Sequence, residues 1–321
     1  MTLSQRRYGT YAWFVLGFTV FVILWGAIVR ATGSGAGCGN HWPTCNGQII
    51  PQPKVIATVI EFTHRITSAL SGLLTIGMVV WAMRAFPKGH LARRGARLSL
   101  AFMIFEGFLG AMLVRLDLVA DNASVARAVA MGIHLINTMI LLGVITLAGW
   151  WARGGQGLAF GGHGVLGWLI YAGLIGMLIL SALGAVTALG DTLFPAETLR
   201  AGLTQDLDPL SHFLIRLRMW HPLLSVALGL YLLAISRSVL HQRPTPIIRQ
   251  LTMVVALIFV VQLAVGGMNI VLLAPVPIQL AHLLLADLLW ITLVLIAIEA
   301  FARGEAAVAA RGVVGALAPR R

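Results

Sequence analysis

Charged residues are scarce in this sequence of 321 residues: they make up 11% of the chain, against about 25% in a typical soluble domain. Hydrophobic residues make up 59%, and the mean hydropathy is +0.90. A soluble protein of this size cannot bury so much apolar surface, so most of that surface must face lipid. The composition therefore excludes a disordered chain and a soluble enzyme.

Acidic residues and cysteines are also few. The chain has 11 acidic residues against 23 Lys and Arg, a net charge of +12, and 2 cysteines. Two cysteines exclude a small disulfide-rich secreted scaffold. The basic residues form no stripe interleaved with aromatic residues, so we do not expect a nucleic-acid partner. The positive charge instead indicates membrane topology, because Lys and Arg collect on the cytoplasmic side of membrane helices.

Long apolar runs dominate what is present. A membrane-spanning helix needs roughly 20 apolar residues, and eight runs approach or exceed that length. Each run must be helical, because an open strand would leave backbone groups unpaired in lipid. We therefore predict an all-α polytopic membrane protein. The runs cover approximately residues 11–30, 55–83, 98–116, 126–150, 164–188, 210–236, 250–273 and 278–302.

The loops between these runs predict the orientation of the chain. With the N-terminus in the cytoplasm, the inside segments carry most of the basic residues, and the outside loops carry six acidic ones. We therefore expect a multi-pass protein of the cell membrane with both termini cytoplasmic. The basic residues placed inside are Arg6, Arg7, Arg84, Lys88, Arg93, Arg94, Arg97, Arg153, Arg237, Arg243, Arg249, Arg303, Arg311, Arg320 and Arg321.

The sequence repeats itself weakly. Gly26-Ala27-Ile28-Val29 matches Gly184-Ala185-Val186-Thr187, and His64-x3-Ser68-x3-Gly72 matches His221-x3-Ser225-x3-Gly229. Such repeats predict two pseudo-symmetric four-helix bundles. We expect an N-terminal half over residues 1–153, a Gly-rich linker over 154–163, a C-terminal half over 164–303 and a cytoplasmic tail over 304–321.

Four of the nine histidines fall on the even-numbered apolar runs: His64, His134, His221 and His282. They lie near the outer ends of those runs, two in each half. An imidazole in lipid is costly without a partner, and two facing neutral imidazoles can hold a haem iron as its axial ligands. The alternative is a histidine bonded to a backbone carbonyl between helices. Zinc fits less well, because no cluster of cysteines or carboxylates stands nearby.

The two halves differ three residues before the first histidine of each pair. Glu61 precedes His64, whereas Arg218 precedes His221. A desolvated carboxylate beside a porphyrin can accept protons or steady a developing cation, and an arginine pairs with haem propionates. We therefore expect a reactive first half and a haem-retaining second half. The alternative for Glu61 is an internal salt bridge with Arg65 or Arg30.

Other intramembrane polar residues leave more than one interpretation open. Three more arginines near the outer boundary are candidates to bind a propionate, or they extend to the membrane interface: Arg65, Arg115 and Arg216. Glu106 and Asp287 lie in the middle of apolar runs without an evident partner, and Gln262 occupies the position of Glu106 in the repeat. We assign no role to these two acids.

Both cysteines, Cys38 and Cys45, lie in the first outside loop. An oxidising exterior favours a disulfide between them. A bond above the reactive pocket could also exchange electrons or gate the substrate. The second half has no cysteine pair, which again distinguishes the first half.

These residues resemble the haem A synthase family, of the bacterial type with a cysteine pair in the first outside loop. The resemblance rests on Gly33-Ser34-Gly35-x2-Cys38-x6-Cys45-Asn46-Gly47, on Glu61-Phe62-Thr63-His64-Arg65, and on the repeated histidines. It implies an eight-helix oxidoreductase that oxidises a methyl group of haem O to a formyl group through successive hydroxylations. It also implies that His64 and His134 hold haem O and that His221 and His282 ligate haem b. Glu61 matches the family's essential acidic position. Some members carry a second cysteine pair, which residues 189–209 lack.

Two hypotheses follow. In the first, the chain is a haem A synthase for terminal oxidase assembly, with Glu61, His64 and His134 as catalytic residues and His221, His282, Arg218 and Arg65 binding cofactor. In the second, it is a b-type di-haem cytochrome that transfers electrons with a quinone. A transporter fits less well, because no broken helix pair is evident. Candidate partners are haem O, the haem O synthase (a farnesyltransferase), a quinone or other electron acceptor, the lipid bilayer and a second copy of the chain.

Overall fold

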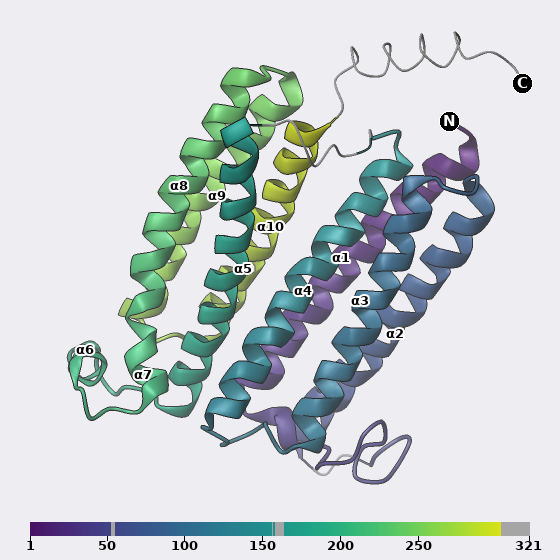
Figure 1. Cartoon of the computed structure of the whole chain (residues 1–321). Helices are drawn as coiled ribbons and strands as arrows, with labels where there is room; N and C mark the ends of the chain where they lie inside the picture. Colours follow the sequence, from purple (N-terminus) through teal and green to yellow (C-terminus); the bar gives the residue numbers. More distant parts are fainter. Residues whose placement is uncertain (53–54, 156, 158–163, 303–321) are drawn as a thin grey trace, which may run out of the picture.

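The structure, a computed structural model, describes residues 1–52, 55–155, 157 and 164–302. Within these ranges, eight helical segments are long and apolar enough to cross a membrane, which confirms the predicted all-α class (Figure 1). Most of the predicted linker 154–163 and all of the predicted tail 304–321 lie outside the described residues. The eight segments are α1 (Leu3–Ala31), α2 (Ile56–Ala85), α3 (Leu91–Arg115), α4 (Val125–Ala152), α5 (Gly164–Leu193), Phe213–Gln242, α9 (Pro246–Val271) and α10 (Val276–Phe301).

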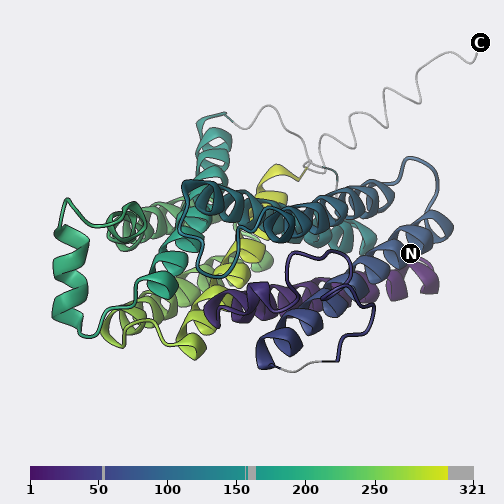
Figure 2. The ribbon, with the colours of Figure 1, turned by 90° about the horizontal axis from the view of Figure 1, so that it is seen from below.

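Three shorter features were not expected from the sequence. The 3-10 helix η1 (Ser34–Ala36) follows α1, and α6 (Leu199–Leu207) follows α5. The segment Phe213–Gln242 is divided into α7 (Phe213–Arg218) and α8 (Trp220–Gln242), with Met219 between them. Figure 2 shows α6 lying to one side of the helix bundle. The sixth spanning segment is therefore interrupted just before His221.

Side-chain caps fix where several helices begin. Thr2 and Gln5 form a reciprocal capping box at the start of α1. The Ser124 hydroxyl accepts from the Arg127 amide at the start of α4, and the Thr245 hydroxyl accepts from the Ile248 amide at the start of α9. Each bond satisfies an amide that has no partner inside its helix. Only the ends of the long helices need such bonds, because the backbone N–H and C=O groups in their interiors are paired within the helix.

Helices α1 to α4 pack against one another, as do α5 and α7 to α10. The two sets lie side by side in Figure 1 and meet through contacts of α4 and α1 with α5 and α10. In α4 and α10, 56% and 50% of the most apolar window is buried, against 11% in α3 and 17% in α9. The helices α4 and α10 therefore form the centre of the molecule, whereas α3 and α9 leave their apolar side chains for lipid.

Polar bonds also join the two sets of helices. The Arg30 guanidinium on α1 donates to the Ala188 carbonyl and the Thr192 hydroxyl on α5, both at 2.7 Å, and to Gln279 Oε1 on α10, also at 2.7 Å. The Trp290 indole on α10 donates to the Met139 carbonyl on α4 at 2.6 Å. The alternative in which Arg30 pairs with Glu61 is therefore wrong.

We call the two ends of the bundle the loop end and the terminal end. The loop end carries the segment between α1 and α2, together with α6. The terminal end carries the N-terminus and the last turn of α10 (Figure 1). His64, His134, His221 and His282 all lie within the first ten residues of helical segments that begin at the loop end.

Candidate functional site

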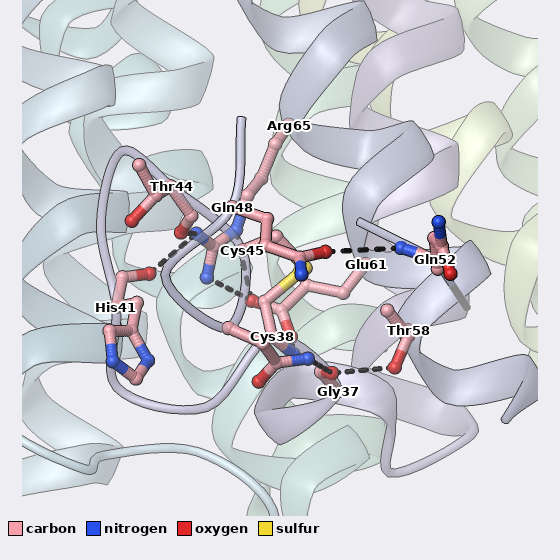
Figure 3. The surroundings of a disulfide bond; sticks show 11 residues. Gly37, Cys38, His41, Thr44, Cys45, Gln48, Gln52, Thr58, Glu61 and Arg65 are labelled. Atoms are coloured by element: carbon pink, nitrogen blue, oxygen red, sulfur yellow. Dashed lines mark hydrogen bonds and ion pairs between the residues drawn. A yellow bond between two sulfur atoms is a disulfide. The ribbon is translucent and has the colours of Figure 1, made fainter. Parts of the chain in front are cut away.

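A disulfide joins Cys38 to Cys45 at the loop end, as predicted. Both cysteines are buried. The loop that they close is held by the backbone N–H of Asn46, which donates to the Cys38 carbonyl at 3.0 Å. Gly37 packs directly against the Ala57 carbonyl of α2, where any Cβ would collide with the backbone. The loop therefore lies tightly against the first turns of α2 (Figure 3).

Glu61 lies directly beneath this loop, with 3% of its surface exposed. The Cys38 amide donates to Glu61 Oε2 at 2.8 Å, and Arg65 donates to Oε1 through Nε at 3.1 Å and through Nη2 at 2.5 Å. Figure 3 shows the carboxylate between the disulfide and the arginine. The internal salt bridge weighed for Glu61 is thus present, with Arg65 as its partner. The carboxylate is held in one orientation, which is a requirement for a defined role in proton transfer.

Arg65 links that carboxylate to the rest of the loop. Its Nη1 donates to the His41 carbonyl at 2.6 Å and to the Thr44 carbonyl at 2.7 Å. The side chain is 13% exposed. One guanidinium therefore clamps both the acid and the disulfide loop. The expectation that Arg65 binds a haem propionate stays a prediction, and these bonds show what else it holds.

Three of the four histidines lie against a glycine of the preceding spanning helix, and two of these contacts occupy matching positions of the repeat. A Cβ placed on Gly26 of α1 would lie 3.0 Å from His64 Cε1, and one on Gly184 of α5 would lie 3.0 Å from His221 Cε1. The repeated Gly–Ala segments thus leave space for a histidine ring in both halves. Only glycine gives these rings room at their present positions.

His134 on α4 lies beside Glu106 on α3. His134 Nδ1 is 3.4 Å from Glu106 Oε1. The carboxylate also accepts from Asn137 Nδ2 at 2.5 Å and from the Thr138 hydroxyl. Glu106, which has no evident partner in the sequence, is therefore a direct neighbour of a predicted iron ligand. Its only signal in the sequence is its match to Gln262 in the repeat.

His221 and His282 face each other in the second half. Their ring centroids are 6.3 Å apart and the ring planes are inclined by 74°. A Cβ on Gly266 would lie 3.1 Å from His282 Cε1. Histidine nitrogens bind metals at about 2 Å, so the spacing accommodates one metal atom between the two rings. The predicted pairing of these two histidines in space is present.

Arg218, which precedes His221, is surrounded by carboxylates. It donates to Asp206 through Nε at 2.8 Å and through Nη2 at 2.6 Å, and to Asp191 through Nη1 at 3.0 Å. These bonds tie α6 and α5 to the end of α7. Arg218 as a propionate ligand stays a prediction. Glu61 and Arg218 thus carry opposite charges at matching positions of the repeat, and each is paired with oppositely charged neighbours.

The histidines fit a haem that is held from both sides. Among the described residues, the buried Nδ1 atoms of all four histidines have no hydrogen-bond partner, and that of His134 lies 3.4 Å from Glu106 Oε1. A buried polar atom left unpaired is costly, and a neutral imidazole with a free ring nitrogen can bind a metal. The same part of the chain contains no group of three or more His, Cys, Asp or Glu residues suited to hold a metal ion. Two facing imidazoles can serve as the axial ligands of a haem iron, whose other ligands come from the porphyrin.

Asp287 is the other intramembrane acid to which the sequence assigns no role. It lies on α10, is fully buried, and neither carboxylate oxygen has a hydrogen-bond partner among the described residues. Its counterpart in the sequence repeat is the apolar Met139. The acid therefore lies on α10 at the centre of the molecule, at a position where the first half has an apolar residue.

A bundle of spanning helices with two histidine pairs at one end defines a class of membrane proteins suited to bind haem. Residues 9–56 and 52–294 match the COX15-CtaA family, described as cytochrome oxidase assembly protein. The chain belongs to this family.

Curated relatives agree with this assignment. A protein of Thermus thermophilus called protoheme IX farnesyltransferase is 49% identical over 303 residues, which are 94% of this chain and 50% of that protein. Proteins called heme A synthase from Geobacillus kaustophilus and Exiguobacterium sibiricum are 35% and 31% identical, over 40% and 56% of this chain and 41% and 59% of their own length. The chain thus spans about half the length of the curated relatives that it matches. The resemblance to the haem A synthases, inferred from the motifs, is confirmed.

Proposed function

We propose that this chain is a haem A synthase, a membrane oxidoreductase that converts a methyl group of haem O to a formyl group by successive hydroxylations. The haem A formed would supply terminal oxidases. The observation that carries the proposal is the pair of histidine sites at one end of the bundle, only one of which has a buried carboxylate under a disulfide loop. Membership of a cytochrome oxidase assembly family supports it.

We assign the two halves different tasks. In the first half, residues 1–153, His64 and His134 hold the substrate haem O from both sides. In the second half, residues 164–303, His221 and His282 hold haem b, whose iron supplies one-electron chemistry when it is bound. Glu61 is the group that distinguishes the reactive site, because Arg218 takes its place in the second half.

Glu61 accepts or returns a proton beside the substrate. The Cys38 amide and the Arg65 guanidinium both donate to its carboxylate, so Oε1 and Oε2 keep fixed positions. Fixed donors stabilise the negative charge without reorganisation during a reaction. The disulfide loop also shields the Glu61 carboxylate from water on that side, since Glu61 and both cysteines are buried.

The name of the Thermus relatives suggests where the substrate comes from. They are called protoheme IX farnesyltransferases and are about twice as long as the matched region. We propose that the matched half corresponds to this chain and that a farnesyltransferase supplies its haem O.

We place the chain in the cell membrane with its loop end outside and its termini in the cytoplasm. The basic residues at the terminal end favour this orientation, and so does the disulfide at the loop end.

Glu61→Gln tests the assignment. The amide keeps the shape of the side chain but cannot take up a proton, so the purified variant should retain its haems while haem A disappears from cell extracts. Glu197→Gln, which changes an exposed carboxylate at the same end of the bundle, should form haem A normally. Haem extraction followed by chromatography measures both.

Undiminished haem A in the Glu61→Gln variant would remove Glu61 from the mechanism. A wild-type protein that carries only haem B, even in cells supplied with haem O, would favour the b-type cytochrome instead.

A further inference from the structure

The strongest unexplained feature of the molecule is the environment of Glu106. This acid lies within spanning helix α3, and its side chain is 20% exposed. Three groups of the next helix converge on its carboxylate: Asn137 Nδ2 at 2.5 Å from Oε2, the Thr138 hydroxyl at Oε1, and His134 Nδ1 at 3.4 Å from Oε1. Asn137 also donates to the Phe102 carbonyl one turn earlier on α3 at 3.1 Å. The carboxylate is therefore fixed in place beside the imidazole.

A carboxylate at Nδ1 has two effects on a histidine that binds a metal. It keeps the ring proton on Nδ1, so that Nε2 is free to bind the metal, and it fixes the orientation of the ring. It also makes the ring a stronger electron donor, because the negative charge favours the partial positive charge on Nδ1–H. In this structure the carboxylate acts through its charge, 3.4 Å from a ring nitrogen that has no hydrogen-bond partner among the described residues, and neither effect requires contact with the metal.

The second half offers a different group at the same place. Gln262 on α9 matches Glu106 in the repeat and also lies beside the histidine of the following helix. Its Nε2 donates to the His282 carbonyl at 3.1 Å and lies 3.4 Å from His282 Nε2. Its Oε1 is buried without a partner among the described residues. The same position thus holds a carboxylate in one half and a neutral amide in the other.

We propose that Glu106 is a positioning residue for His134 and makes the first-half haem site the one with the lower reduction potential. A fixed negative charge near a haem iron favours the oxidised form, which carries more positive charge. The neutral Gln262 gives the second half no such preference, so an electron shared by the two sites resides mainly in the second half. This inference rests on the proposed function, in which His64 and His134 hold a haem.

The test is a redox titration of the purified full-length protein, followed by the visible absorption of each haem. The variants His134→Ala and His282→Ala assign the two haem signals, since each should remove one of them. In the wild-type protein the signal that depends on His134 should have the lower midpoint potential. Glu106→Gln should raise that midpoint potential and leave the other unchanged, and Glu106→Asp, which keeps the charge, should restore most of the difference.

The outcomes separate this inference from the proposed function. A first-half haem that remains bound in Glu106→Gln at an unchanged potential overturns the inference alone, as does an equal shift of both signals. The Glu106→Gln variant can also lose this haem. Retention of the haem in Glu106→Asp then supports the inference. Loss of the haem in Glu106→Asp as well overturns it, because Glu106 then acts only through packing. A wild-type protein with no haem signal that depends on His134 overturns the proposed function, and the inference with it.

Discussion

Single glycines give three of the four histidine rings their space. Gly26, Gly184 and Gly266 each lie where a Cβ would come within 3.0–3.1 Å of a histidine Cε1. At that distance the ring must shift by a few tenths of an ångström. If the ring binds a metal, as proposed, such a displacement lowers its affinity, as the loss of an orienting partner does. The sequence marks these glycines only as parts of a repeat. Their function depends on which helix packs against which, and the sequence alone does not fix that.

Gly266→Ala and Gly267→Ala form a matched pair at adjacent positions of α9. The added methyl group at residue 266 meets His282, whereas at residue 267 it meets nothing within 4 Å. We expect Gly266→Ala to weaken retention of the second-half haem by about tenfold or more, the size of effect that lost ligand orientation has at metal sites. Haem content after competition with apomyoglobin measures this.

Gly267→Ala should keep its haem as the wild type does. Equal haem loss in both variants would mean that α9 tolerates no added side chain in this region. It would contradict a specific effect of the contact between residue 266 and His282.

The glutamates show why some partners could be predicted and others could not. Glu61 and Arg65 are four residues apart on one helix, so their salt bridge was among the alternatives that the sequence offered. Glu106 and His134 stand on different helices, and their contact depends on the register between α3 and α4. Apolar side chains set that register through packing, and their pattern in the sequence does not specify it.

At the scale of elements, the disulfide loop and the start of α2 act as one unit. Arg65 binds Glu61 and two loop carbonyls, and the Thr58 hydroxyl donates to the Gly37 carbonyl at 2.7 Å. The disulfide closes a short ring, which stabilises by roughly 2–3 kcal/mol in the loop-entropy estimate. Hydrogen bonds to a charged group contribute about 1.5–3 kcal/mol each, so the arginine matters as much as the disulfide.

Arg65→Lys should loosen this unit while keeping its charge. A lysine ammonium is a compact point charge and cannot bind the carboxylate and both carbonyls as the planar guanidinium does. Loss of one such bond corresponds to about a tenfold change in an equilibrium constant. We therefore expect the Cys38–Cys45 bond to be reduced and labelled with a thiol reagent about tenfold faster.

Arg115→Lys is the matched control. Arg115 is exposed at the loop end of α3, and this substitution should leave the labelling rate unchanged. An unchanged rate in Arg65→Lys would show that the disulfide and the backbone alone hold the loop.

The spanning helices were largely predictable, and the short ones were not. Apolar length alone located all eight spans, although α1 begins at Leu3 and α3 at Leu91, several residues earlier than their apolar runs. Polar residues extend these helices at the terminal end, where water and basic side chains replace lipid. Helix α6 and the break at Met219 depend on tertiary bonds such as those from Arg218 to Asp206 and Asp191. Hydropathy carries no information about such bonds.

At the scale of the whole molecule, the two sets of helices are joined yet build separate sites. Helices α4 and α10 connect them through the bond from Trp290 to Met139. Arg30 on α1 adds bonds to α5 and α10. In each set, histidines from two helices lie at the loop end: those of α2 and α4 in one, and those of α8 and α10 in the other. If each pair holds a haem, as proposed, the two haems are expected to fill and empty independently.

A haem inventory of the purified protein tests this central claim most directly. We predict two haems in the wild type, loss of one in the double variant His64→Ala and His134→Ala, and loss of the other in His221→Ala and His282→Ala. His41→Ala, which changes an exposed loop histidine, should retain both. Loss of both haems in either double variant, or of neither in both, would contradict the assignment of one site to each histidine pair.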